Sequence, residues 1–394
     1  MNAAPRIYYL DDIPTPYRIG VQRRIAALWP GSLRLAFCAS AEPGRQWSFD
    51  FSGLDIEVLP GRQIRPKKQV NPMSVKWNPY VLSSLSAYRP DVVVLSGYVH
   101  PTAQMAAWWC RRQGIPYGVA SETHRRSTHV GGMKWIMKRM ITRNLLRGMK
   151  FSLPTGRAAG EFLDLIGGVQ KPKFFFPNTP DISIYTAASA RAARGEGDEL
   201  CRRFGIAEGR KIILFVGRLI DAKRPLDALR AFQSLGEAAS EAVLVFIGDG
   251  PLGEQIRSVS YSVANIVCTG WLKDPVDISL LMAKSTALVL PSQHEPWGAV
   301  VNEAMAAGTP VLASDHVGAA LELVESGRNG FIYQVGDIVA LSDKMRQVLF
   351  DDVLLLSMAK AAQATALEHG HEFAAANFVD AMRFATGTHT TLSI

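Results

Sequence analysis

The chain has 394 residues, of which 48% are hydrophobic and 20% are charged, and its formal net charge at pH 7 is +8. This length is too great for one ordinary hydrophobic core and suits two domains of about 150 to 200 residues, while the composition excludes a disordered or fibrous protein. The positive charge suits an anionic partner, such as a phosphorylated small molecule, an anionic lipid or a nucleic acid.

The cysteines and the N-terminal segment indicate the cellular compartment. Four cysteines lie far apart, without metal-ligand or paired spacing: Cys38, Cys110, Cys201 and Cys268. We therefore expect a reducing environment and no zinc site. The N-terminal segment reaches the acidic pair Asp11 and Asp12 too early for a signal peptide, and no apolar run approaches the roughly 18 residues of a membrane span. These features predict a cytoplasmic protein.

Short apolar, β-branched segments alternate with helix-like segments along most of the chain. They are residues 6–10, 33–39, 55–59, 91–97 and 116–120 in the first half, and 211–217, 242–248, 265–270, 286–292, 309–314 and 330–334 in the second. Strands this apolar, separated by helical stretches, predict parallel sheets with helices on both faces. The predicted class is α/β, with one doubly wound, Rossmann-like sheet in each half and ligands outside the carboxyl ends of the strands.

The alternation breaks between about residues 174 and 209, where prolines, small residues and charges show no sustained period. We predict a linker in this segment. The expected domains are residues 1–180 and 181–370. Residues 371–394 are expected to form a C-terminal helix that packs back toward the first domain.

Residues 134–150 are the most basic part of the chain, with six Lys and Arg and no acidic residue. At helical spacing, Trp135, Met140 and Leu145 would give this segment an apolar side. We favour a surface helix with a solvated basic face over a helix in the interface of an anionic membrane, which would make the protein peripheral. Nucleic acid fits less well, because the basic residues lack an aromatic platform or a known motif.

Two loops of the second half carry candidate phosphate contacts. After residues 211–217, Gly217 permits a close backbone approach, and Arg218 and Lys223 can both face the strand's carboxyl end, where they would bind a diphosphate. A solvated loop with surface charges gives the same pattern. In the next loop, two glycines flank Asp249, which indicates a tight turn over a site or a turn alone.

The segment after residues 286–292 combines a polar loop with a helix. We expect this helix to open at Gly298, so that the N–H groups of Gly298 and Ala299 lie at its N-terminus, a natural site for a diphosphate. Glu295 precedes the helix and Glu303 lies inside it, so the two carboxylates can accept hydrogen bonds from different hydroxyl groups of one elongated ligand. Either acid alone is more often a cap or a surface residue.

These motifs occur in a specific order, and together they resemble one family. In sequence they are "FVGRLIDAKRP", "IGDGPL", "GWL", "EPWGAVVNE", "AMAAGTPVLASD" and "ESGRNGFIY", which span about residues 211 to 335. The second half thereby resembles the nucleotide-sugar domain of family 4 of the GT-B glycosyltransferases. This large retaining family includes bacterial polysaccharide and glycolipid mannosyl- and glucosyltransferases. The resemblance implies two Rossmann-like domains that face one another across a cleft.

The resemblance also implies roles for the motif residues. Glu295 would approach the hydroxyls of the donor sugar and Glu303 the ribose, and Arg218 and Lys223 would hold the diphosphate without a metal ion. His294 and Trp297 flank Glu295 and complete the expected donor site.

The first half matches the family less closely. His124 occupies the position of the family's active-site histidine, with His100 as a rival. The family's Gly-Gly loop is missing near the N-terminus, where Tyr17 or Arg18 could substitute.

We therefore expect a metal-independent glycosyltransferase without a cofactor. It would transfer a hexosyl unit, with retention, from a nucleoside diphosphate sugar to a glycan or lipid-linked acceptor in cell-surface polysaccharide or glycolipid synthesis. A GT-B epimerase or phosphorylase is an alternative of the same architecture. A non-catalytic protein that binds sugar nucleotides or an anionic surface is an alternative of another class.

Overall fold

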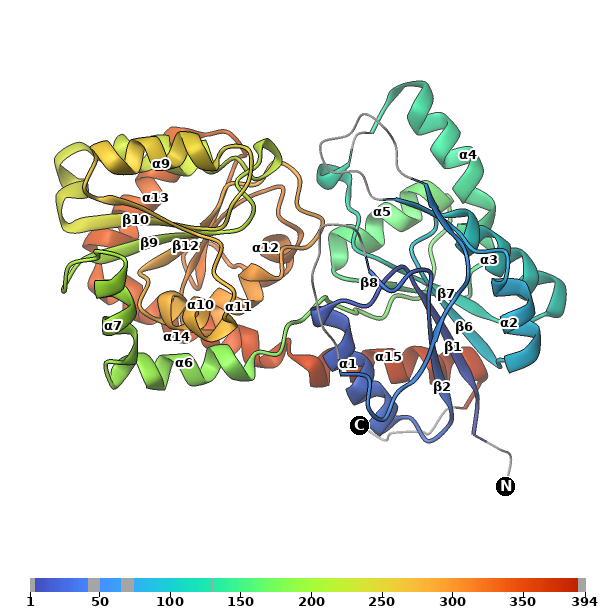
Figure 1. Cartoon of the computed structure of the whole chain (residues 1–394). Helices are drawn as coiled ribbons and strands as arrows, with labels where there is room; N and C mark the ends of the chain where they lie inside the picture. The colour runs from blue at the N-terminus through green and yellow to red at the C-terminus, as the bar shows by residue number, and fades with distance from the viewer. Residues whose placement is uncertain (1–3, 42–49, 65–73, 129, 389–394) are drawn as a thin grey trace. The chain divides into compact units, whose positions relative to one another are not determined.

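The computed structural model describes residues 4–41, 50–64, 74–128 and 130–388. It contains two compact units (Figure 1). Unit 1 comprises Met1–Arg125, His129–Thr179 and His371–Ile394, and unit 2 comprises Arg126–Thr128 and Pro180–Gly370. No helix of the described residues is long and apolar enough to cross a membrane.

Unit 1 is built on a six-stranded parallel sheet in the order β3-β2-β1-β6-β7-β8. Its strands are β1 (Ile7–Asp11), β2 (Leu33–Phe37), β3 (Asp55–Val58), β6 (Val92–Ser96), β7 (Tyr117–Ser121) and β8 (Phe151–Pro154). Its helices are α1 (Pro16–Leu28), α2 (Val81–Tyr88), α3 (Pro101–Gln113), α4 (Gly132–Gly148), α5 (Arg157–Gly167) and α15 (His371–Thr386). Two short antiparallel strands, β4 (Arg62–Ile64) and β5 (Val75–Trp77), form a separate ribbon.

Unit 2 repeats this architecture with the strand order β11-β10-β9-β12-β13-β14. Its strands are β9 (Lys211–Val216), β10 (Ala242–Ile247), β11 (Ile266–Gly270), β12 (Ala287–Leu290), β13 (Val311–Ser314) and β14 (Gly330–Tyr333). Its α-helices are α6 (Ser183–Ala193), α7 (Glu196–Arg203), α8 (Pro225–Gln233), α9 (Gly253–Ser262), α10 (Pro275–Ala283), α11 (Val300–Ala306), α12 (Gly318–Leu323), α13 (Ile338–Phe350) and α14 (Asp352–Glu368). The 3₁₀ segments η2 (Asp221–Lys223) and η3 (Gly236–Glu241) lie in its loops.

The central strands of each sheet are largely apolar because both faces of the sheet are covered. In β9, Ile212 and Leu214 belong to one hydrophobic cluster, whereas Ile213 and Phe215 belong to another. Successive side chains of a strand point to opposite faces, so each cluster lies between the sheet and one layer of helices. The predicted α/β class with two doubly wound parallel sheets is confirmed.

The chain passes from unit 1 to unit 2 at Thr179 and Pro180, inside the segment predicted as a linker, but much of this segment is helical. This segment contains α6 and α7, both of which pack against α10. Leu200 and Cys201 of α7, together with Ile206, are buried in the core of unit 2. The sequence of α6 is rich in alanine, and small residues bury a helix face by close approach without the periodic large side chains that the prediction relied on.

The last helix, α15, belongs to the core of unit 1, although unit 2 separates it from that unit in the sequence. It packs against α1, β6 and β8, and Figure 1 shows it in red. Phe378 is fully buried, with ring centroids 5.7 Å from Tyr9 and 5.4 Å from Phe176. Unit 1 therefore completes its core with residues from the end of the chain.

We expect Phe378→Ala to lower the free energy of unfolding of unit 1 by about 3–5 kcal/mol, because it leaves a cavity among buried rings. Calorimetric unfolding of the full chain would measure this loss. Phe350→Ala is the matched control, since Phe350 is 50% exposed in α13 and should change stability little. Equal losses from the two substitutions would contradict the buried position of Phe378.

Candidate functional site

The strand order of unit 2 reverses between β9 and β12, which are neighbours in the sheet. In open α/β sheets, ligands bind outside the carboxyl ends of the strands at such a reversal. The loop after β9 carries Lys223 and the loop after β12 carries Glu295. The ammonium group of Lys223 forms an ion pair with Glu295 Oε2, so these predicted residues, 72 positions apart, meet at the reversal.

The environment of this ion pair is largely closed to solvent. The side chains of Lys223 and Glu295 are 19% and 11% exposed, and Ser292 Oγ lies 3.5 Å from Glu295 Oε2. The backbone N–H groups of Gln293 and His294 both donate to the carbonyl of Ala222, at 2.9 and 3.3 Å. The two loops are therefore joined through side chains and backbone, and each desolvated charge is compensated by its partner.

The glycines around Gly217 allow two backbone segments to come together. A Cβ atom at Gly248 would lie 2.0 Å from the carbonyl oxygen of Gly217, and Gly248 has φ +139°. Arg218 follows with an exposed side chain at the same sheet edge. Asp249 is also exposed, and its Oδ1 accepts from the Gly250 N–H at 2.8 Å, which lowers the pKa of the carboxyl. These contacts stabilise a turn, and a ligand role for Asp249 stays a prediction.

The start of the helix after Glu295 differs from the prediction. The helix α11 begins at Val300 rather than at Gly298, which has φ +94° and precedes the N-cap Ala299. Gly298 must be a glycine, because a Cβ atom there would lie 2.9 Å from Glu295 Cγ. The N–H groups of Gly298 and Ala299 thus lie just before the helix, and their role in diphosphate binding stays a prediction.

Trp297 has a packing role that differs from the predicted ligand contact. Its side chain is 3% exposed within the core of unit 2. The indole Nε1 donates to Asn302 Oδ1 at 3.1 Å. A buried tryptophan usually satisfies its N–H in this way. Trp297 therefore anchors the loop from inside, and its contact with a ligand stays a prediction.

Glu303 and His294 have perturbed protonation equilibria. Burial raises the pKa of Glu303, in the first turn of α11, to about 7, against the effect of a hydrogen bond with Tyr185. Partial burial, followed by the positive charges of Lys223 and His316, lowers the pKa of His294. A carboxyl group that titrates near neutrality is common at functional sites, although buried structural networks produce it too.

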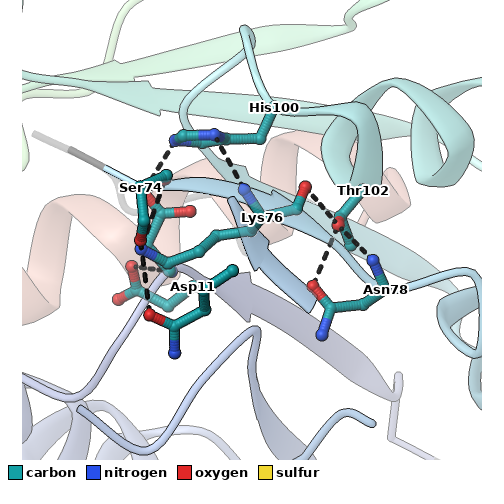
Figure 2. A network of polar contacts seen from close by, with 8 residues as sticks. Asp11, Ser74, Lys76, Asn78, His100 and Thr102 are labelled. Carbon is teal, nitrogen blue, oxygen red and sulfur yellow. Dashed lines mark hydrogen bonds and ion pairs between the residues drawn. The ribbon is translucent and has the colours of Figure 1, made fainter. Parts of the chain in front are cut away.

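Unit 1 has a second polar cluster, also at a reversal of strand order, between β1 and β6. His100 Nε2 lies 3.2 Å from Asp12 Oδ2, and Lys76 is 2% exposed with its Nζ 2.6 Å from Ser74 Oγ. Figure 2 shows the connected network that includes Ser74, Lys76 and His100. Sequence analysis named His100 but missed Lys76, because a lone lysine in a short strand gives no signal of burial.

Arg18 and His124 are buried in unit 1. The guanidinium of Arg18 donates to Tyr9 Oη and lies 3.9 Å from Asp11 Oδ2, and the arginine is 9% exposed. His124 follows β7 and is 1% exposed. The Arg18 side chain is thus held inside unit 1 by Tyr9 and Asp11 and does not extend into solvent.

Within the described residues, no group of three or more His, Cys, Asp or Glu is placed to hold a metal ion.

Comparisons with known proteins connect the site in unit 2 to a family. Residues 198–365, less than half of the chain, match the model of the glycosyl transferases group 1. This segment contains β9 to β14, Arg218, Lys223 and both acids. Within unit 2, residues 198–365 are therefore similar to the glycosyl transferases group 1.

Curated relatives match at modest identity. N-acetyl-alpha-D-glucosaminyl L-malate synthase of Bacillus anthracis is 28% identical over 196 residues, which are 49% of this chain and 50% of the relative. Sulfoquinovosyl transferase SQD2 of Arabidopsis thaliana is 27% identical over 311 residues, which are 76% of this chain and 57% of the relative. The chain thus spans about half the length of these two relatives.

A solved structure extends the likeness over both units. The crystal structure of Anabaena HepE in complex with UDP aligns with a TM-score of 0.72 at 18% identity and covers 96% of this chain and 99% of that chain. At this identity the likeness shows the fold, which is GT-B.

We expect Lys223 and Glu295 to be strongly coupled in stability. Lys223→Met leaves a desolvated carboxylate unpaired, so it should destabilise unit 2 more than the double substitution Lys223→Met/Glu295→Gln does. The interaction energy should be about 1–3 kcal/mol in a double-mutant cycle measured by urea denaturation. Arg230→Met/Glu237→Gln, at exposed positions, is the control cycle. Additive effects at Lys223 and Glu295 would contradict their pairing.

The raised pKa of Glu303 predicts a dependence of stability on pH. The native state binds this proton more tightly than the unfolded chain, so the free energy of unfolding falls as pH rises from about 4.5 to about 7. Glu303→Gln should remove this component, so the substituted protein should gain on the order of 1–3 kcal/mol relative to wild type between pH 5 and pH 8. Urea denaturation at each pH would measure it, with the exposed Glu237→Gln as control. A constant difference across this range would rule out the raised pKa.

Proposed function

We propose that the protein transfers a hexosyl unit from a nucleoside diphosphate sugar to an acceptor hydroxyl, with retention of the anomeric configuration. The observation that carries the proposal is the Lys223–Glu295 ion pair at the reversal of strand order in the part of unit 2 that is similar to the glycosyl transferases group 1. It combines an anion-binding cation with an acceptor of sugar hydroxyls at the edge where such sheets bind ligands.

The cations have a direct role in this proposal. Breaking the bond between the anomeric carbon and the phosphate creates an oxocarbenium-like centre and a diphosphate leaving group. Arg218 and Lys223 lie where they can neutralise the charge that develops on the diphosphate. Two such cations can do this without a metal ion, so we propose a metal-independent reaction.

The carboxylates orient the donor in this proposal. Glu295, paired with Lys223, accepts hydrogen bonds from the hydroxyls of the transferred sugar, and Glu303 does so from the ribose. In a front-face mechanism, the leaving phosphate oxygen takes the acceptor proton, so neither acid needs to act as a covalent nucleophile. The pKa of about 7 at Glu303 supports a donor affinity that rises with pH around neutrality, since only the carboxylate accepts two hydroxyl donors.

Unit 1 binds the acceptor in this proposal. Its polar cluster around His100, Asp12 and Lys76 lies at the carboxyl edge of its own sheet, where a hydroxyl-rich glycan or a lipid-linked sugar would find donors and acceptors. In this proposal His124 contacts the donor sugar or its diphosphate, and His100 is its rival for that role. The proposed setting is the synthesis of a cell-surface polysaccharide or glycolipid.

Donor turnover with and without acceptor would test this function. The donor screen begins with uridine diphosphate sugars, because HepE was crystallised with UDP, and continues with guanosine and adenosine diphosphate sugars. We expect Arg218→Ala and Glu295→Ala each to lower kcat/KM by about 10²- to 10³-fold. Arg230→Ala, an exposed cation of α8, should leave it unchanged.

Other outcomes would replace the proposal. Turnover of the donor sugar without an acceptor would indicate an epimerase, and dependence on inorganic phosphate would indicate a phosphorylase. Tight nucleotide binding without turnover by any acceptor would indicate a binding protein. Full activity of both Arg218→Ala and Glu295→Ala would show that the site lies elsewhere.

A further inference from the structure

The helix α4 of unit 1 exposes large apolar side chains on its solvent side. Their exposed fractions are 72% at Met133, 52% at Ile136, 55% at Met137, 72% at Met140 and 58% at Ile141. Their spacing of i, i+3, i+4, i+7 and i+8 places them in one continuous stripe along the helix. We refer to these five residues as the α4 stripe. A surface helix normally carries polar residues on this side, so the stripe lacks an explanation in folding alone.

The opposite side of α4 already holds the helix on unit 1. Leu145 and Leu146 are 2% and 0% exposed, and Trp135 stacks on Phe162 of α5 at 5.7 Å. The sequence predicted that Trp135, Met140 and Leu145 share one apolar side of this helix. This prediction is wrong for Met140, which faces solvent, whereas Trp135 and Leu145 face the unit. The α4 stripe is a second apolar face, which the core of unit 1 leaves uncovered. Figure 1 shows α4 in teal.

The chain segment that contains α4 carries charge of one sign. No acidic residue occurs from Thr123 to Gly160, and this segment contains nine cations: Arg125, Arg126, Lys134, Lys138, Arg139, Arg143, Arg147, Lys150 and Arg157. Arg143 and Arg147 are exposed in the last turns of α4, next to the stripe on the same side of the helix. An apolar stripe next to exposed cations is the pattern of a helix that lies in the interface of an anionic membrane.

We propose that α4 docks unit 1 onto an anionic lipid bilayer. The α4 stripe enters the boundary between head groups and acyl chains, and Arg143 and Arg147 contact the head-group phosphates. A second copy of the chain is a poorer occupant, because stripe-to-stripe contact would bring together two helices whose charged residues are all cations. Methionine and isoleucine without an aromatic anchor also suit fluid acyl chains better than a specific protein pocket.

This docking does not depend on the proposed reaction, since no residue of α4 belongs to the site in unit 2. If both proposals hold, the acceptor cluster of unit 1 works beside a membrane, which favours an acceptor attached to a lipid. Docking can be tested without donor or acceptor, so the failure of one proposal is distinguishable from the failure of the other.

Vesicle sedimentation of the full chain tests the docking. We expect the wild-type protein to sediment with vesicles of phosphatidylglycerol and phosphatidylcholine, and to bind phosphatidylcholine vesicles at least about tenfold more weakly. Met137→Gln/Met140→Gln should weaken binding to the mixed vesicles by about tenfold, because it removes apolar side chains from the interface. Arg143→Gln/Arg147→Gln should weaken it by about fivefold per cation and reduce its salt dependence.

Matched controls separate docking from general changes of the surface. Val353→Gln/Leu356→Gln replaces two apolar residues of α14 that are at least as exposed as Met137, and Arg202→Gln/Arg203→Gln replaces two exposed cations of α7. Both controls should bind the mixed vesicles like wild type. All four variants change exposed positions, and unchanged melting temperatures would verify that they fold.

Three results would overturn the proposal. The first is wild-type protein that stays in the supernatant with mixed vesicles at low salt. The second is equal binding by wild type and Met137→Gln/Met140→Gln. The third is a lipid-free dimer of the wild type, seen by analytical ultracentrifugation, that this variant lacks, since the stripe would then be covered by a second copy.

Discussion

The reversal of strand order between β9 and β12 is the constraint on which the candidate site depends. It brings the loops that follow these two strands together only at the carboxyl edge of the sheet. Lys223 and Glu295 occupy that edge, and each compensates the partly desolvated charge of the other. The backbone bonds from residues 293 and 294 to Ala222 hold both loops in the positions that this ion pair requires.

The same constraint acts independently in unit 1, where the order reverses between β1 and β6. Asp12 follows β1 and His100 follows β6, and they meet as Lys223 and Glu295 do. Lys76 joins this edge from the antiparallel ribbon rather than from the sheet. The two units thus concentrate polar side chains at equivalent edges, while apolar strands and the added helix α15 supply the cores that hold them.

Most of the fold could be predicted because the strands of a parallel sheet with helices on both faces are recognisable as short apolar segments. Eleven such segments were predicted, and each overlaps a strand of the two sheets. The twelfth, β8, was missed because its four residues, "FSLP", include a serine and a proline. The strands β4 and β5 were missed because they have three residues each and carry charged side chains.

The candidate site could be predicted in its residue types but not in its contacts. The ordered motifs identified Arg218, Lys223, Glu295 and Glu303, and the structure brings Lys223 and Glu295 into contact. Nothing local indicated that Trp297 would turn into the core. A tryptophan beside a polar loop has the same sequence environment whether it contacts a ligand or supports the loop, so only its neighbours in space distinguish the two.

Sequence alone was enough for features that depend on residues close together in the chain, such as the apolar strands, the alternation with helices and the motifs in the loops. The tertiary structure decided which charges pair across 72 positions, where α11 begins, and which side of α4 faces solvent. The physical reason is that desolvation depends on every segment that packs around a side chain. Met140 and Leu145 are both apolar residues of one helix, but α3 and α5 cover one side of α4 and leave the other exposed.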